Sequence, residues 1–154
     1  VLVLTERKTR IEIILRPKDK TAAETARCLR YLKHIFGRDY NKIFKTITCD
    51  NGSEFADQQA FERVGSMFFY CHPSCPSERG SNENANILIR RKLPKGQSMK
   101  NVTQKQATQI QHWLNDYPRH IFDGKTAFEM FMQELPAMNL HNPKRIVNFF
   151  DPHP

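Results

Sequence analysis

Two acidic residues stand where the sequence could place metal-binding carboxylates. Asp50 follows the β-prone residues 44–49 and precedes a turn that begins with Asn51 and Gly52. Glu83 comes 33 positions later, at the start of a predicted helix. Mg²⁺ and Mn²⁺ prefer hard oxygen ligands, and two-metal phosphoryl transfer needs carboxylates that converge from different elements. The pair fits that chemistry, and it equally fits a simple turn at Asp50 and an acid favoured by the helix dipole at Glu83.

The helix predicted from residue 82 to about residue 93 has two distinct faces at 100° per residue. Its apolar face carries Ala85, Leu88 and Ile89, and the opposite face carries Glu83, Asn86 and Arg90. Arg90 lies two turns beyond Glu83, where it could hold a DNA phosphate beside a metal ion. The basic track continues with Arg91, Lys92 and Lys95. An ordinary amphipathic helix with a solvated basic face gives the same pattern.

The charge of the chain is unevenly distributed. Its 154 residues contain 24 Lys and Arg against 16 Asp and Glu, a formal net charge of +8. Residues 1–50 carry +6 and residues 73–105 carry +5. Clustered basic charge is typical of proteins that bind polyanions, although a basic surface without a partner is also common.

The hydrophobic pattern predicts an α/β protein. Strands are expected at residues 1–4, 11–15, 44–49 and 67–71, the first two as a hairpin. Helices are expected at residues 21–36, 58–64, 82–93, 103–117 and 126–135. Residues 38–42 are predicted to be a polar loop, and residues 136–154 an extended or loosely packed tail. The sequence contains neither an apolar run of about 18 residues nor a signal-peptide pattern, so we expect a cytoplasmic protein without a membrane segment.

The four cysteines do not favour a metal centre. Cys71, His72 and Cys75 cluster, but a structural zinc ion requires a second pair of ligands at similar spacing. We therefore expect reduced thiols and no zinc.

Four segments in order resemble the integrase-like catalytic core of IS30-family transposases. They are residues 3–10 (VLTERKTR), 48–55 (TCDNGSEF), 78–86 (ERGSNENAN) and 124–131 (GKTAFEMF). The resemblance runs from residue 1 to about residue 134, which it implies is the catalytic core, with residues 135–154 as a C-terminal tail. It implies a ribonuclease H-like fold of the retroviral-integrase type, a mixed sheet flanked by helices, here with its first strand missing.

The resemblance also implies a DDE mechanism, in which a nicked transposon end attacks target DNA with the help of Mg²⁺ or Mn²⁺. Asp50 then matches the second acid, Glu83 the third, and Arg90 the basic residue two turns after it. The implied DNA contacts are Arg79, Arg90, Arg91, Lys92 and Lys95. The implied site-shaping residues are Asn51, Gly52, Asn82, Asn84 and Asn86. Implied partners are transposon ends, target DNA and further copies of the chain, at a bacterial nucleoid.

The first acid of such a triad is expected on a strand that precedes Val1. Without that central strand, the sheet should divide into two half-sheets with unpaired edges, and activity and stability should be low. An inactive remnant that binds only DNA or a full-length transposase remains an alternative. A nuclease of the same fold is a third possibility, because fold alone does not determine function.

Overall fold

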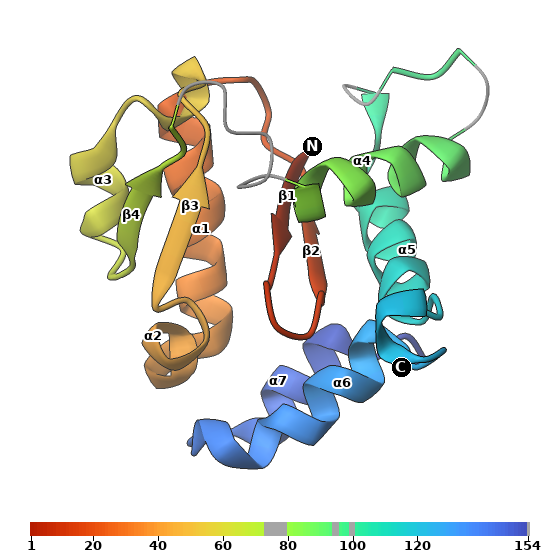
Figure 1. The fold of residues 1–154 in the computed structure, drawn as a ribbon. Helices are drawn as coiled ribbons and strands as arrows, with labels where there is room; N and C mark the ends of the chain where they lie inside the picture. Colours follow the sequence, from red (N-terminus) through yellow and green to blue (C-terminus); the bar gives the residue numbers. More distant parts are fainter. Residues whose placement is uncertain (73–79, 94–95, 99–100, 154) are drawn as a thin grey trace. The chain divides into compact units, whose positions relative to one another are not determined.

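The chain folds into two units, and each unit is built from separate segments of the sequence. A computed structural model describes residues 1–72, 80–93, 96–98 and 101–153 (Figure 1). The first unit, here the hairpin unit, contains Val1–Arg16, Gly80–Asn139 and Pro143–Pro154. The second, here the parallel unit, contains Pro17–Arg79 and Leu140–Asn142. Each unit is described by itself below.

The hairpin unit is built on two antiparallel strands. Strand β1 (Leu2–Thr5) pairs with β2 (Glu12–Leu15) in the register Leu2↔Leu15 to Thr5↔Glu12. The carboxylate of Glu6 orders the connecting turn, because it accepts hydrogen bonds from the backbone N–H groups of Lys8 and Thr9 at 2.9 and 2.6 Å. The predicted hairpin is therefore confirmed.

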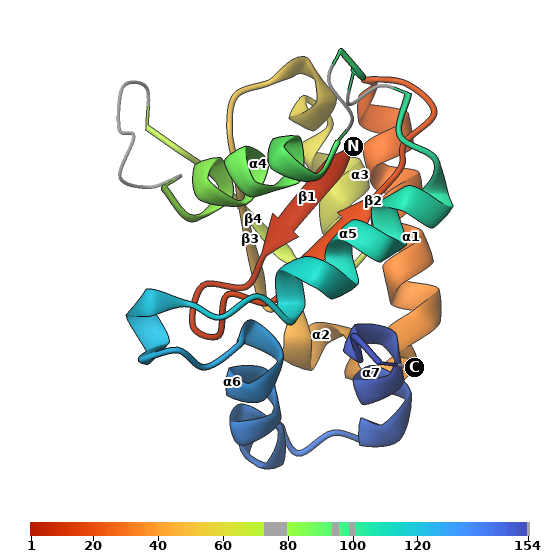
Figure 2. The same ribbon diagram turned by 90° about the vertical axis from the view of Figure 1, so that its right-hand side faces the viewer.

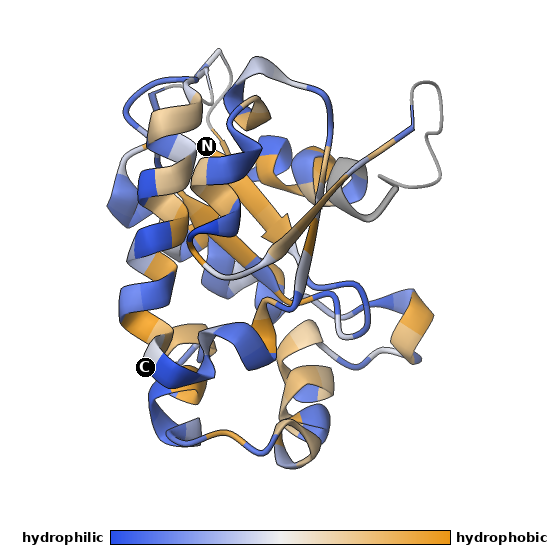
Figure 3. Ribbon diagram, turned by 90° about the vertical axis from the view of Figure 1, so that its left-hand side faces the viewer, coloured by the Kyte–Doolittle hydropathy of each residue, from blue (hydrophilic) through white to orange (hydrophobic). Residues whose placement is uncertain are grey.

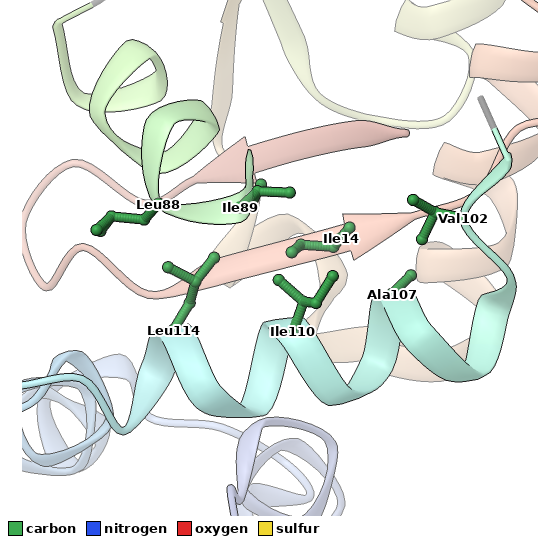
Figure 4. Close-up of a cluster of buried hydrophobic side chains, with 7 residues drawn as sticks. All are labelled: Ile14, Leu88, Ile89, Val102, Ala107, Ile110 and Leu114. Atoms are coloured by element: carbon green, nitrogen blue, oxygen red, sulfur yellow. The ribbon is translucent and has the colours of Figure 1, made fainter. Parts of the chain in front are cut away.

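Helices α4 (Gly80–Lys92) and α5 (Gln104–Asn115) pack against the hairpin, α4 on β1 and α5 on β2 (Figure 2). The predicted apolar face of α4 is confirmed, since Ala85, Leu88 and Ile89 are all buried. Apolar side chains from both helices and β2 form one cluster (Figure 4): Ile14, Leu88, Ile89, Val102, Ala107, Ile110 and Leu114. Burying this cluster attaches both helices to the hairpin.

Side-chain amides of α5 cover the outer edge of β2. Asn115 Oδ1 accepts a hydrogen bond from Glu12 N at 2.8 Å, and its Nδ2 donates to Glu12 O at 3.1 Å. One helical turn earlier, Gln111 Oε1 accepts from Ile14 N at 3.0 Å. Four residues along the helix cover about the same length as two residues along the strand, so Asn115 and Gln111 reach the backbone groups of Glu12 and Ile14. These hydrogen bonds pair the exposed backbone groups at this edge of β2.

The C-terminal part of the hairpin unit is helical. Helix α6 (Ala127–Glu134) starts with a capping box formed by Thr126 and Glu129, and the short helix η6 (Leu135–Met138) follows it. The prediction of an extended tail was wrong, because residues Pro143–Phe150 form helix α7. Pro143 is the first residue of α7, where the missing N–H costs nothing. Phe150 is buried against Phe131, with ring centroids 4.9 Å apart.

The parallel unit begins with helix α1 (Ala22–Phe36), which is capped by Thr21 and ends at Gly37 with φ +54°. Its buried residues form a stripe, visible in the alternating colours of Figure 3. The predicted polar loop at residues 38–42 was wrong: η1 (Gly37–Asp39) and α2 (Tyr40–Ile43) occupy it. The reason is burial, because Tyr40 stacks on Phe44 with ring centroids 4.8 Å apart.

Strands β3 (Thr46–Cys49) and β4 (Met67–Tyr70) pair in parallel, joined through η2 (Ser53–Phe55) and α3 (Gln58–Glu62). Phe68 of β4 is buried and stacks on Phe61 of α3, with ring centroids 5.0 Å apart. Met67 and Phe69 point to the opposite, exposed face. The predicted strand, helix, strand order is confirmed.

The described residues thus form a mixed α/β fold with two separate two-stranded sheets. This arrangement is compatible with a ribonuclease H-like fold. The expected separation into two sheets is observed among the described residues, and its attribution to a missing central strand stays a prediction. The predicted domain boundary near residue 134 stays a prediction. Within the described chain, no helix is both long and apolar enough to cross a membrane.

Candidate active site

Asp50 lies at the carboxyl end of β3, in the loop that leads to η2. Its Oδ1 accepts a hydrogen bond from Gly52 N at 2.9 Å, and the residue is half-buried. The carboxyl ends of parallel strands are where open α/β sheets bind ligands. Asp50 therefore lies directly after a strand, as predicted, and its catalytic role stays a prediction.

Asn51 ties this loop to the chain that follows β4. Its Nδ2 donates a hydrogen bond to Cys71 O at 3.2 Å, while Cys71 N donates to Cys49 O at 2.9 Å. The residues before and after Asp50, Cys49 and Asn51, are thus both hydrogen-bonded to Cys71. These two bonds fix the backbone on both sides of Asp50.

Gly52 leaves space for neighbouring side chains and does not serve an unusual backbone conformation. Its φ of −65° and ψ of 150° suit any residue. A Cβ atom at this position would lie 2.6 Å from Glu54 Oε2 and 2.8 Å from Asp50 Oδ1, closer than real Cβ atoms approach. The absent side chain therefore leaves room for two carboxylates at the same place.

Glu54 is a candidate site residue that the sequence reasoning missed. Its Oε2 atom is buried and makes no hydrogen bond within the described residues, while Lys20 Nζ lies 3.3 Å from it. The 3₁₀ helix η2 that carries Glu54 is anchored by the hydroxyl of Tyr70, which donates to Phe55 O at 2.6 Å. The sequence signal that could have identified Glu54 is an acidic residue four positions after Asp50, in the same turn-rich segment.

Glu83, the second predicted acid, lies in the first turn of α4 in the hairpin unit. The described side chains of this helix start at Asn84, so the side chains of Asn82 and Glu83 lie outside the described residues. Arg79 and Lys95 lie outside them as well.

Along the described part of α4, exposed and buried positions follow the predicted two faces. Asn84, Arg90 and Arg91 are exposed, and Asn86 is half-buried. The two arginines therefore present their guanidinium groups to solvent at the end of the helix, as phosphate binding would require.

Lys92 has a different environment from the two arginines. Its Nζ lies 4.1 Å from the centroid of the Trp113 ring, a cation–π contact. Trp113 also packs at the edge of the hydrophobic cluster, and its ring lies 5.2 Å from that of Tyr117.

The structure places the two candidate acids in different units, Asp50 in the parallel unit and Glu83 in the hairpin unit. Among the described side chains, no group of three His, Cys, Asp or Glu residues gathers as a metal centre. Cys71 is buried, and Cys75, the other thiol of the predicted cluster, lies outside the described residues.

Two buried acids lie outside the candidate site. Glu12 is 1% exposed, and burial raises its pKa to about 7 against the opposing effects of the Thr5 hydroxyl and Arg119. Asp39 is also 1% exposed. Burial alone would raise the pKa of Asp39, but the backbone N–H groups of His141 and Asn142 outweigh it and lower that pKa.

Known proteins resemble the chain across most of its length. The transposase for insertion sequence element IS4351 of Bacteroides fragilis is 40% identical over 97 residues, which cover 62% of this chain and 30% of that protein. The probable transposase for insertion-like sequence element IS1161 of Streptococcus salivarius is 30% identical over 131 residues, covering 85% of this chain and 36% of that protein. Transposase InsI for insertion sequence element IS30C of Escherichia coli K12 is 32% identical over 131 residues, covering 84% of this chain and 33% of that protein.

These relatives are transposases of insertion sequences. No family model matches the chain. By these sequence relationships the chain belongs to the IS30-family transposases. It spans about a third of the length of the curated relatives it matches.

Proposed function

We propose that the chain supplies two acids, Asp50 and Glu83, to the catalytic centre of a DDE transposase with a ribonuclease H-like core. The reaction would be metal-dependent phosphoryl transfer: nicking of a transposon end, followed by attack of the freed 3′-hydroxyl on target DNA. The observation that carries the proposal is the Asp50 carboxylate, oriented by Gly52 N–H at the end of β3, in a chain related to transposases.

The donor set around Asp50 suits Mg²⁺ or Mn²⁺. Oxygen atoms of Asp50 and Glu54 lie beside the space that a Cβ of residue 52 would fill, and the Glu54 oxygen is buried without a hydrogen bond in the described chain. Both ions prefer hard oxygen ligands of this kind. These oxygens support Asp50 as a proposed metal ligand, and the same role is proposed for Glu83 on the family resemblance.

When bound, such ions supply Lewis-acid stabilisation of the charge that develops on a transferring phosphate. The residues of this chain have separate tasks. Asn51 and Gly52 hold the carboxylate of Asp50 in place, the first through Cys71 O and the second through its own N–H. Asn82 and Asn84, the two sequence neighbours of Glu83, are proposed to make orienting contacts, and Asn86 to shape the site.

Arg90 and Arg91 are proposed to bind DNA phosphates. Both are exposed in the last turn of α4, and guanidinium groups match phosphate oxygens in a bidentate manner. Arg79, Lys92 and Lys95 would extend the same contact, although Lys92 would first have to leave the Trp113 ring. Association of several copies on paired transposon ends completes the proposal.

A strand-transfer assay tests this function. The complete natural reading frame that contains this sequence is purified and mixed with labelled duplexes from the ends of its own element, a supercoiled plasmid and Mn²⁺. Asp50→Asn and Glu83→Gln should each reduce joined product by roughly two orders of magnitude or more. Glu62→Gln removes an exposed acid from the parallel unit and should leave the product unchanged.

Three results would decide between the candidates. Joined product that persists in both acid variants would contradict the proposal. Binding of the duplexes without any nicking or joining, in the unchanged protein, would favour the inactive remnant that only binds DNA. Cleavage of plasmid without joining would favour a nuclease.

A further inference from the structure

Helix α1 carries a run of positive charge that the proposed function does not use. The segment Arg27–Arg38 contains four Arg and Lys residues and no Asp or Glu. All four are exposed, on the side of the helix away from its buried stripe. Together with Tyr31, which is 47% exposed among them, they form a surface that we call the α1 basic face. Its members are Arg27, Arg30, Tyr31, Lys33 and Arg38.

The acids nearest to this run in the sequence are already engaged inside the parallel unit. Glu24 accepts a hydrogen bond from Arg27 Nε at 2.9 Å. Asp39 is 1% exposed, and its two oxygens accept hydrogen bonds from backbone N–H groups at 2.7 and 2.8 Å. The other cations of the face form no ion pair with any residue that the structure describes: Arg30, Lys33 and Arg38. The α1 basic face therefore keeps a positive charge that the parallel unit does not neutralise.

Arg30 shows most clearly that this charge lacks compensation. Residues three apart are neighbours on a helix, and like charges at that spacing repel. Arg27 lies three residues before Arg30, and Lys33 lies three residues after it. Arg27 is offset by Glu24, and Lys33 lies in the last turn, where the helix dipole favours a cation. Within the described chain Arg30 has neither compensation, so an anion outside the chain would stabilise this arrangement.

The spacing of the face suits the regular charges of a DNA backbone. A helix rises about 1.5 Å per residue, so Arg27, Arg30 and Lys33 form an oblique row about 9 Å long. One strand of duplex DNA carries a phosphate about every 3.4 Å along its axis, so the row spans about two to three phosphates. Guanidinium groups bind phosphate oxygens in a bidentate manner, and the hydroxyl of Tyr31 is a donor of the kind that contacts phosphates and sugars. The row therefore fits an evenly charged polyanion better than a single small anion.

We propose that the α1 basic face binds the phosphate backbone of duplex DNA without regard to base sequence. The inference rests on the proposed function, which makes DNA the substrate of this chain. The face belongs to the parallel unit, whereas Arg90 and Arg91 belong to the hairpin unit. Each unit therefore has a DNA contact of its own, and the contact on α1 is one that the catalytic proposal does not require.

The test measures the binding of fluorescently labelled duplexes by anisotropy, with the complete natural reading frame and without divalent ions. One duplex comes from an end of its own element, and the other has an unrelated sequence. Arg30→Gln combined with Lys33→Gln should weaken binding to both duplexes by the same factor, about tenfold or more near 0.1 M salt. The slope of log affinity against log salt should become shallower by about 2, one for each lost phosphate contact.

Two matched double variants serve as controls. Lys45→Gln with Arg63→Gln removes the same charges from exposed positions of the parallel unit outside α1, and it should leave affinity and slope nearly unchanged. Arg30→Lys with Lys33→Arg keeps both charges and should keep the slope. Circular dichroism of each variant verifies that the helices are intact.

Four results would overturn the proposal. The first is unchanged affinity and slope in the Arg30 and Lys33 double glutamine variant. The second is an equal loss in the Lys45 and Arg63 variant, which would mean that only net charge matters. The third is a loss confined to the element end, which would mean sequence-specific recognition. The fourth is unchanged DNA binding with lost binding to vesicles of acidic phospholipid, which would assign the face to a membrane surface.

The failure of this inference differs from the failure of the proposed function. If Asp50→Asn abolishes strand transfer while the Arg30 and Lys33 double variant binds DNA normally, the transposase function stands and the α1 basic face has no role in it. If Asp50→Asn leaves strand transfer intact, the proposed catalytic role is contradicted, and the anisotropy measurements still decide whether α1 binds DNA.

Discussion

Glu12 in the hairpin unit and Asp39 in the parallel unit are equally buried acids with opposite titration behaviour. Each is 1% exposed, yet the pKa of Glu12 is raised to about 7 and that of Asp39 is lowered. Burial disfavours the charged form of both groups. The difference comes from the stronger desolvation of Glu12 together with the hydrogen-bond donors and charges that surround each carboxylate.

Asp39 receives several donors to its charged form. The backbone N–H groups of His141 and Asn142 donate to its two oxygens at 2.7 and 2.8 Å, and Lys42 Nζ lies 3.7 Å away. These contacts hold the segment Leu140–Asn142 in the parallel unit. The ionised carboxylate is therefore part of the structure of that unit.

Glu12 has a weaker set of partners. The hydroxyl of Thr5 donates to its Oε2 at 2.7 Å, and the charge of Arg119 favours its ionised form without outweighing burial. In the hairpin unit, buried polar side chains such as Asn115 are neutral amides that pair with the strand backbone. The hairpin unit thus raises the pKa of its buried acid Glu12, and the parallel unit lowers the pKa of its buried acid Asp39.

The largest effect is expected at Asn115. Asn115→Ala removes the partners of both backbone groups of Glu12, and each buried unsatisfied group costs about 1–3 kcal/mol, for a total of about 4 kcal/mol. Urea unfolding followed by the fluorescence of Trp113, the chain's single tryptophan, measures the loss. A decrease in the free energy of unfolding of less than about 1 kcal/mol would mean that water takes over the hydrogen bonds of the Asn115 amide to Glu12.

Glu12→Gln should increase stability at alkaline pH. Because the native pKa of about 7 lies above the ordinary value of 4.5, the contribution of Glu12 is complete below pH 4.5 and is lost as the pH rises through 7. The neutral variant avoids that loss, so it should gain up to about 3 kcal/mol at pH 8.5 and nothing at pH 4. Trp113 fluorescence in urea at both pH values provides the comparison, and an equal gain at pH 4 would contradict it.

Asp39→Asn should have the opposite pH dependence. The lowered pKa of Asp39 gives stability that is present above the ordinary Asp value and is lost as the pH falls below it. The variant should therefore cost about 2 kcal/mol at pH 7, from weakened charge-assisted hydrogen bonds, and progressively less below pH 4. Circular dichroism in urea across this range measures it. A cost that stays constant down to pH 2.5 would rule out an electrostatic origin.

The smallest effect is expected at Asn51. Asn51→Ala removes a single hydrogen bond to Cys71 O from an exposed side chain, so it should cost about 1 kcal/mol. It is the counterpart of Asn115→Ala in the other unit. Hydrogen exchange of the β3 and β4 amides gives the local change, and a loss equal to that of Asn115→Ala would erase the contrast between the two units.

Regular elements were predictable where a local pattern coincided with packing. Thr21 and Gly37 delimit α1 as predicted, and the apolar face of α4 is buried as predicted. Helix α2 was missed because Tyr40 is buried against Phe44 and its hydroxyl accepts a hydrogen bond from the distant Ser66. Helix α7 was missed because Phe150 packs on the distant Phe131. Composition and local propensity do not contain such contacts.

Of the candidate site, the sequence predicted the position of Asp50. The sequence indicated that Asp50 ends a strand, and the structure confirms it. Glu54 and Lys20 were missed because their relation to Asp50 depends on how η2 packs against α1, and spacing alone does not report this. Whether Glu83 acts with Asp50 stays a prediction.

The most direct test of the central claim asks whether one metal ion contacts both acids. Fe²⁺ can substitute for Mg²⁺, and with ascorbate and peroxide it generates radicals that cut the polypeptide beside the bound ion. We predict two cuts in the full chain, one near residues 50–54 and one near residue 83, and both should disappear in Asp50→Asn and in Glu83→Gln. A cut near residue 83 that survives Asp50→Asn would show that the two acids do not share a metal ion, and would contradict the account.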